Sequence, residues 1–127
     1  MKKIVIFGKR IPNEVQTFIE RTIDSLVQEG CSIFIYERFQ TRINEHWGLN
    51  WNFPEFKSRE DILKSQPDFL LVIGGDGTLL DATTLVEGTD IPIIGLNTGR
   101  LGFLANITRD EAPMALKSIL KGDYTID

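Results

Sequence analysis

The clearest pattern along the chain is a series of short apolar runs without polar alternation. Four such runs, bounded by glycine or proline, cover residues 4–7, 33–36, 69–73 and 91–96. A strand that is apolar on both sides is covered on both faces, which is typical of a parallel sheet. Most of the intervening segments are long enough for a crossover helix. The pattern therefore predicts an α/β fold with an open, mostly parallel sheet and flanking helices.

Helices are expected between these runs. The first has Pro12 near its start and Gly30 just past its end, and its apolar stripe consists of Val15, Phe18, Ile19, Ile23, Leu26 and Val27. A second helix is predicted over residues 58–65, where Ser58 and Asp61 have capping-box spacing. A third is predicted from about Thr78 to Val86, and a last one carries residues 115–120 with Asp110 as its cap.

Residues 37–57 break this alternation. The segment contains His46, Trp47, Trp51 and Phe53 with no clear period, so we expect an irregular or partly helical excursion packed by its own aromatic side chains. Packing is the expected role of the two tryptophans, and an aromatic flap over the sheet edge is the alternative.

Composition and charge narrow the class of protein. The chain has 127 residues, of which 42% are hydrophobic and 25% charged, as in one ordinary domain. Its 18 acidic and 14 basic residues give a net charge of -4, the wrong sign for binding nucleic acid. The first apolar run is too short for a signal peptide or a membrane span. Cys31 is the only cysteine and is expected to be a small buried hydrophobe. We therefore expect a cytoplasmic protein with neither a nucleic-acid nor a membrane partner.

Glycine-rich polar segments follow three of the predicted strands. Gly8, Lys9 and Arg10 follow the first, residues 74–78 the third and residues 97–100 the fourth. Ligands of open parallel sheets bind beyond the carboxyl ends of the strands. We therefore expect the three segments to share one rim of the sheet and to form a joint site.

The segment 74–78, Gly-Gly-Asp-Gly-Thr, has the composition of a phosphate-binding turn. Its first two glycines let a phosphate or ribose approach the main chain, and the amides of Gly77 and Thr78 open the next helix. Asp76 would be costly beside a phosphate unless a cation intervenes or the carboxylate orients or deprotonates an attacking hydroxyl. Both roles belong to phosphoryl transfer. The alternative is that Asp76 merely caps the helix that begins near Thr78.

Residues 97–104, Asn-Thr-Gly-Arg-Leu-Gly-Phe-Leu, again combine glycines with polar groups. Phe103 either stacks on a base or packs in the core beside Leu101 and Leu104. Arg100 either contacts a ligand or is a solvated surface charge.

Together, residues 74–78 and 93–104 closely resemble the NAD kinase family, and the resemblance extends over the whole chain. Gly-Gly-Asp-Gly-Thr alone is shared with diacylglycerol and sphingosine kinases, whereas the second motif is specific to NAD kinases. The resemblance implies a Rossmann-like domain of an enzyme that phosphorylates the 2′-hydroxyl of the adenosine ribose of NAD. The donor would be ATP or another phosphoryl donor, with a divalent metal ion such as Mg²⁺.

The same resemblance implies roles for individual residues. Asp76 is expected to be catalytic, engaging the ribose hydroxyl as a base, and Gly77 to lie against the dinucleotide. Phe103 is expected to line the adenine side. The expected nucleotide-binding residues are Asp76, Gly77, Thr78, Asn97 and Phe103, and no metal ligand is assigned. Asp81 stands where many relatives carry a basic residue, so it is given no binding role.

NAD kinases have a second, β-rich domain with an Asn-acid pair and a Thr-Pro-Thr-Gly loop that complete the NAD pocket. We expect residues 1–127 to be a single α/β nucleotide-binding domain that ends before this second domain, in a full-length protein that is a homo-oligomer. Asn44 and Glu45 are not taken as the pair because they precede the glycine motif. The alternatives are a non-catalytic nucleotide-binding or regulatory domain and, disfavoured by residues 97–104, a lipid kinase of the diacylglycerol kinase type.

Overall fold

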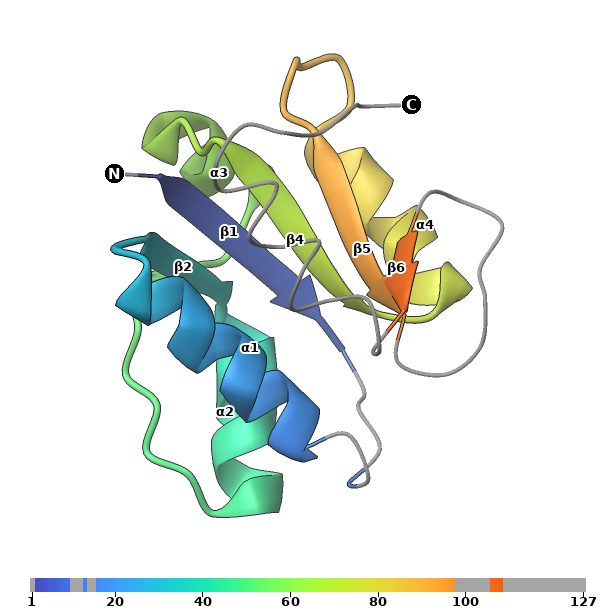
Figure 1. The fold of residues 1–127 in the computed structure, drawn as a ribbon. Coiled ribbons are helices and arrows are strands. Elements are labelled where there is room, and N and C mark those ends of the chain that lie inside the picture. Colours follow the sequence, from blue (N-terminus) through green and yellow to red (C-terminus); the bar gives the residue numbers. More distant parts are fainter. Residues whose placement is uncertain (1, 10–12, 14–15, 98–105, 109–127) are drawn as a thin grey trace.

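The computed structural model describes residues 2–9, 13, 16–97 and 106–108 (Figure 1), with the backbone alone at Asp76, Asn97 and residues 106–108. Its centre is a six-stranded sheet in the order β3-β2-β1-β4-β5-β6, with every pair parallel. The strands are β1 (Lys3–Gly8), β2 (Ser32–Tyr36), β3 (Glu55–Phe56), β4 (Phe69–Gly74), β5 (Ile93–Asn97) and β6 (Asn106–Thr108). The predicted parallel α/β sheet is confirmed.

Among the described residues, four helices flank the sheet (Figure 1). They are α1 (Gln16–Gln28) and α2 (Glu37–Trp47) on one face, and α3 (Arg59–Ser65) and α4 (Asp76–Leu85) on the other. Alternate residues of the strands meet α1 and α2 in one core cluster and α3 and α4 in the other. In β1, Ile4 and Ile6 belong to the first cluster, and Val5 and Phe7 to the second. Each fully buried aliphatic side chain contributes about 1.5–3 kcal/mol, so both apolar faces of the central strands stabilise the fold.

The four apolar runs form β1, β2, β4 and β5, although β5 begins at Ile93 rather than at residue 91. α1 confirms the first predicted helix, and Ile19, Ile23 and Leu26 of its stripe are buried. Val27 is an error in that stripe, because 48% of it is exposed. Val15 and the helix predicted around residues 115–120 with Asp110 as its cap lie outside the described residues.

Two helix starts differ in detail from the predictions. Ser58 is the N-cap residue of α3, but its side chain makes no capping hydrogen bond. Instead the carboxylate of Asp61 accepts a hydrogen bond from the backbone N–H of Lys57 at 2.9 Å, so the capping box does not form. α4 begins at Asp76, two residues before the predicted start near Thr78.

Residues 37–57 are partly helical, as expected, but they also contain a short strand that the sequence did not predict. α2 begins directly after β2, and β3 extends the sheet by pairing with residues 35 and 36. The connecting residues 48–54 are irregular, as predicted. Trp47, Trp51 and Phe53 are partly buried against the first core cluster, which confirms their packing role.

Two amide side chains of α2 hold the connecting segment in place. Gln40 accepts a hydrogen bond from the N–H of Phe53 at 2.9 Å and donates one to the carbonyl of Phe53 at 3.2 Å. Asn44, one turn later, makes the same pair of bonds to Trp51, at 2.9 and 3.0 Å. The side-chain amides thus replace the backbone partners that a neighbouring strand would provide. Asn44 therefore has a structural function here.

Replacing Gln40 with Met should test the contribution of the hydrogen bonds between Gln40 and Phe53, because Met has a similar length but no amide. The N–H of Phe53 would lose its acceptor, and we expect the free energy of unfolding to fall by about 1–3 kcal/mol in urea denaturation. The control is Thr41→Ala, an exposed position of the same helix, which should change stability by at most about 0.5 kcal/mol. Equal stability of the two variants would contradict a stabilising role of the Gln40 hydrogen bonds.

Candidate functional site

The chain changes its direction of winding between β1 and β4, which are neighbours at the centre of the sheet. Such a switch point leaves a crevice beyond the carboxyl ends of the strands, where ligands of this architecture bind. In the register, Gly8 lies beside Ile73, and Gly74 lies beside Asn97. The ends of β1, β4 and β5 therefore reach the same rim, as the sequence predicted.

Gly74 is required by the protein's own packing. Its φ is +155°, and a Cβ at this position would lie 2.9 Å from both Cβ and Oγ1 of Thr78. Real Cβ atoms essentially never approach other atoms so closely. The side chain of Thr78 therefore packs on the bare backbone of Gly74, which fixes the start of α4 against the end of β4.

Gly75 and Gly77 differ from Gly74, because a Cβ at either position would meet nothing within 4 Å. Both residues are exposed. Packing against the described part of the chain therefore does not explain why they are glycines. Their missing side chains leave the main chain at the start of α4 open to a ligand.

Asp76 is the first residue of α4, and Gly75 occupies the N-cap position before it. The alternative of Asp76 as the N-cap is thus wrong in position, because the helix starts earlier than predicted. The N–H of Leu79 donates a hydrogen bond to the carbonyl of Gly75, the N-cap residue, at 3.1 Å. The amides of Gly77 and Thr78 precede this donor, so the helix itself does not use them. They present the positive end of the helix dipole at the rim.

A pocket of about 510 Å³ opens at this rim between β1, α2 and α4. Its lining residues are Gly8, Lys9, Tyr36, Arg38, Phe39, Arg42, Gly77, Thr78 and Asp81. Gly77 and Thr78 of the predicted site thus line one pocket, directly after Asp76. Asn97 ends β5 beside Gly74, whereas Phe103, with Arg10 and residues 98–100, lies outside the described residues.

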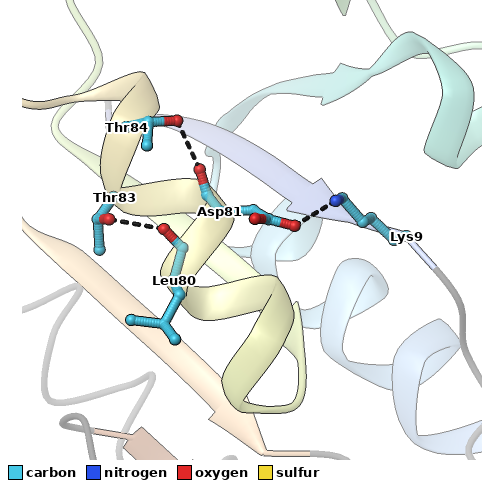
Figure 2. Close-up of polar contacts among 5 residues, drawn as sticks. All are labelled: Lys9, Leu80, Asp81, Thr83 and Thr84. Carbon is cyan, nitrogen blue, oxygen red and sulfur yellow. Dashed lines mark hydrogen bonds and ion pairs between the residues drawn. The ribbon is translucent and has the colours of Figure 1, made fainter.

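Lys9 and Asp81 both line this pocket. Their side chains form an ion pair (Figure 2). Lys9 follows the end of β1, and Asp81 lies in the second turn of α4. The two side chains are about half exposed, at 50% and 53%. The hydroxyl of Thr84 donates to the backbone carbonyl of Asp81 at 2.8 Å, so it leaves the carboxylate to Lys9. Such exposed pairs contribute about 0–1 kcal/mol, which makes this one easy to exchange.

Arg38 and Arg42, which also line the pocket, were not among the residues predicted from the sequence. A sequence signal for them existed, because the two arginines are four residues apart and follow the carboxyl end of β2 at the same rim. Placing them on one helix face required the prediction of α2, and the apolar residues of segment 37–57 show no clear helical period. Gly8 holds this helix close, because a Cβ at Gly8 would lie 2.5 Å from the ring of Phe39.

Other chemistry finds little support in the described residues. Among them, no group of three or more His, Cys, Asp and Glu side chains gathers to hold a metal ion. Cys31 packs at the edge of the first core cluster. Burial raises the pKa of its thiol, and the carboxylate of Glu29 raises it further, so the thiolate form is disfavoured. None of the described helices is long and apolar enough to cross a membrane.

Comparison with known proteins gives a consistent result. The family described as ATP-NAD kinase N-terminal domain matches residues 4–124. The NAD kinase of Flavobacterium psychrophilum is 38% identical over 98% of this chain and 42% of its own length. The NAD kinase of Porphyromonas gingivalis is 34% identical over 100% of this chain and 43% of its own length. The chain thus spans less than half the length of these curated relatives.

A solved structure, that of yeast NADH kinase complexed with NADH, has a TM-score of 0.71. The match covers 97% of this chain and 39% of the yeast chain, at 17% sequence identity. At this identity the likeness shows a shared fold.

Two glycine substitutions should show that packing requires a glycine at position 74 but not at position 75. Gly74→Ala introduces both backbone strain and a clash with Thr78, and we expect the free energy of unfolding to fall by about 1–3 kcal/mol or more. Gly75→Ala adds a methyl group in open space at a φ of −106°, and its effect on stability should stay within about 1 kcal/mol. Urea denaturation of both variants measures the difference. A Gly74→Ala protein as stable as Gly75→Ala would overturn the packing role of Gly74.

Proposed function

Because this chain belongs to the ATP-NAD kinase N-terminal domain family, we propose that it forms the nucleotide-binding part of an NAD kinase. The enzyme transfers a phosphoryl group from ATP to the 2′-hydroxyl of the adenosine ribose of NAD and so produces NADP. The observation that carries this proposal is the position of Asp76. It opens α4 at the switch point between two exposed glycines, neither of which is required by a contact with the described residues.

In the proposed reaction, Asp76 is the general base. The proton of the 2′-hydroxyl passes to its carboxylate as the ribose oxygen forms a bond to the γ-phosphorus of ATP. The bond between this phosphorus and the bridging oxygen breaks, and ADP leaves. A divalent cation such as Mg²⁺, held together with the phosphates, would neutralise their charge.

The backbone around Asp76 supplies the remaining parts of the site. The amides of Gly77 and Thr78, at the positive end of α4, stabilise the negative charge of the transferred group. Gly77 lies against the dinucleotide. Asn97 shapes the neighbouring loop, and Phe103 lines the adenine side.

The proposal extends to the setting of the enzyme. We place it in the cytoplasm, acting on the small molecules NAD and ATP as a homo-oligomer, without a nucleic-acid or membrane partner. A second, β-rich domain would complete the NAD pocket. Tests of turnover therefore use the full-length protein that contains this sequence.

Asp76→Asn removes the base but keeps the size and polarity of the side chain. We expect kcat to fall by a factor of about 10²–10⁴, while the midpoint of thermal unfolding stays close to that of the unchanged protein. NADP formed from NAD and ATP is measured with an NADP-dependent dehydrogenase. Asp24→Asn, at an exposed site on α1, is the matched control and should leave kcat unchanged. Turnover retained in Asp76→Asn would defeat the role of Asp76 as the base.

The two alternatives predict different results for the unchanged protein. A regulatory domain would bind NAD or ATP in calorimetry without forming NADP. A lipid kinase would phosphorylate diacylglycerol in preference to NAD. NADP formation above background, with no phosphorylated lipid, is the outcome that we expect.

A further inference from the structure

The pocket at the switch point has a positive charge that the chain as a whole does not have. Its lining contains three cations, Lys9, Arg38 and Arg42, and one carboxylate, that of Asp81. The net charge of the chain is -4. Cations from α2 and from the residue that follows β1 therefore line one hollow of an acidic protein.

Arg38 and Arg42 are available to a ligand. They lie four residues apart, on the same side of α2, where like charges repel each other slightly. Among the described residues, neither forms an ion pair or a hydrogen bond, and both are exposed. A bound anion would relieve their repulsion, and guanidinium groups match phosphate oxygens in paired hydrogen bonds.

Carboxylates near the two arginines are an alternative partner. A second hollow, on which Arg38 and Arg42 also border, carries Glu37, Glu45 and Glu55. Glu37 is paired with Lys57, and Glu55 accepts a hydrogen bond from Gln40 at 2.6 Å. Two of the three carboxylates thus have other partners, and among the described residues the third, Glu45, forms no ion pair with either arginine.

The position of these arginines is set by buried structure. Phe39, which lies between them in sequence, is 1% exposed and packs against Gly8 at the end of β1. This contact anchors the backbone of α2 at the rim. The arginine side chains therefore extend from a fixed helix that faces the start of α4 across the pocket.

We propose that this pocket binds the linked phosphates of the phosphoryl donor, with Arg38 and Arg42 as phosphate ligands and the Lys9–Asp81 pair as a regulator of affinity. The inference rests on the proposed kinase function and adds the place and partners of the donor phosphates. In the absence of donor, Asp81 holds Lys9. When the phosphates bind, Lys9 turns to them, and the carboxylate of Asp81 lowers the affinity by repulsion.

The size and the remaining lining fit this ligand. A volume of about 510 Å³ lies within the range of about 300–1,000 Å³ for small-molecule sites. Gly77 and Thr78 line the same pocket directly after Asp76. A phosphate chain anchored on α2 would thus have its terminal group near the start of α4, where the proposed base lies.

Calorimetry with inorganic tripolyphosphate, and separately with ATP, tests the pocket at fixed ionic strength on the 127-residue chain. We expect Arg38→Gln combined with Arg42→Gln to weaken binding of both ligands by at least about tenfold, the effect of losing charge-assisted hydrogen bonds. Arg21→Gln combined with Lys64→Gln is the matched control. It removes the same charge from exposed sites on α1 and α3 and should change the affinity by at most about twofold through the long-range field.

Asp81→Asn provides a change in the opposite direction. It frees Lys9 and removes the one carboxylate, so we expect the affinity for tripolyphosphate to rise about threefold or more, while Lys9→Gln lowers it. Equal affinities of the arginine variant and its control would overturn the proposal. So would unchanged or weaker binding in Asp81→Asn, or no binding by the unchanged chain at millimolar tripolyphosphate.

These measurements need neither NAD nor turnover, so they separate the two proposals. Binding that depends on the arginines, together with an active Asp76→Asn enzyme, would leave the donor pocket standing and remove the catalytic proposal. An inactive Asp76→Asn enzyme whose arginine variant binds like the control would do the reverse. Circular dichroism of each variant confirms that its fold is intact.

Discussion

The parallel pairing of β1 with β4 is the constraint on which the rest of the structure depends. Both strands are buried along most or all of their length, so each needs helices on both faces. α1 and α2 cover one face, and α3 and α4 cover the other. Because β1 lies between β2 and β4, the chain winds outward to one side and then to the other. This reversal creates the rim at which Gly8, Lys9 and the start of α4 meet.

Glycines at this rim serve two different physical purposes. At Gly8 and Gly74, the ring of Phe39 and the side chain of Thr78 occupy the space that a Cβ would need. At Gly75 and Gly77, the corresponding space is open. The first pair fixes the positions of α2 and α4, and the second pair leaves their shared rim accessible. Such a rigid frame around a bare main chain would suit the in-line phosphoryl transfer that we propose, because that reaction relies on positioning and electrostatics.

Charge is distributed in accordance with this arrangement. An acidic chain places three cations around one pocket and offsets one of them with Asp81. No binding role was expected for Asp81 from the sequence, but its carboxylate offsets the charge of Lys9 in this pocket. The ion pair is half exposed, so exchange of its carboxylate for a phosphate would cost little. Membership of the ATP-NAD kinase N-terminal domain family and this distribution of charge both agree with the ligand that we propose, a nucleotide with linked phosphates.

The sequence by itself determined the four long strands, α1, the parallel α/β class, the shared rim and the family, because these depend on local periodicity and on motifs with fixed spacing. Only the tertiary structure decided the rest. β3 has two residues and exists because the edge of β2 pairs with it, and its approach is held by Gln40 and Asn44 from another element. The start of α4 at Asp76 follows from the packing of Thr78 on Gly74, which no helix-start rule includes. Lys9 and Asp81 are 72 residues apart, and Arg38 and Arg42 reach the same pocket through the contact of Phe39 with Gly8. Such long-range contacts leave no periodic trace in the sequence, so they become visible only when the chain is folded.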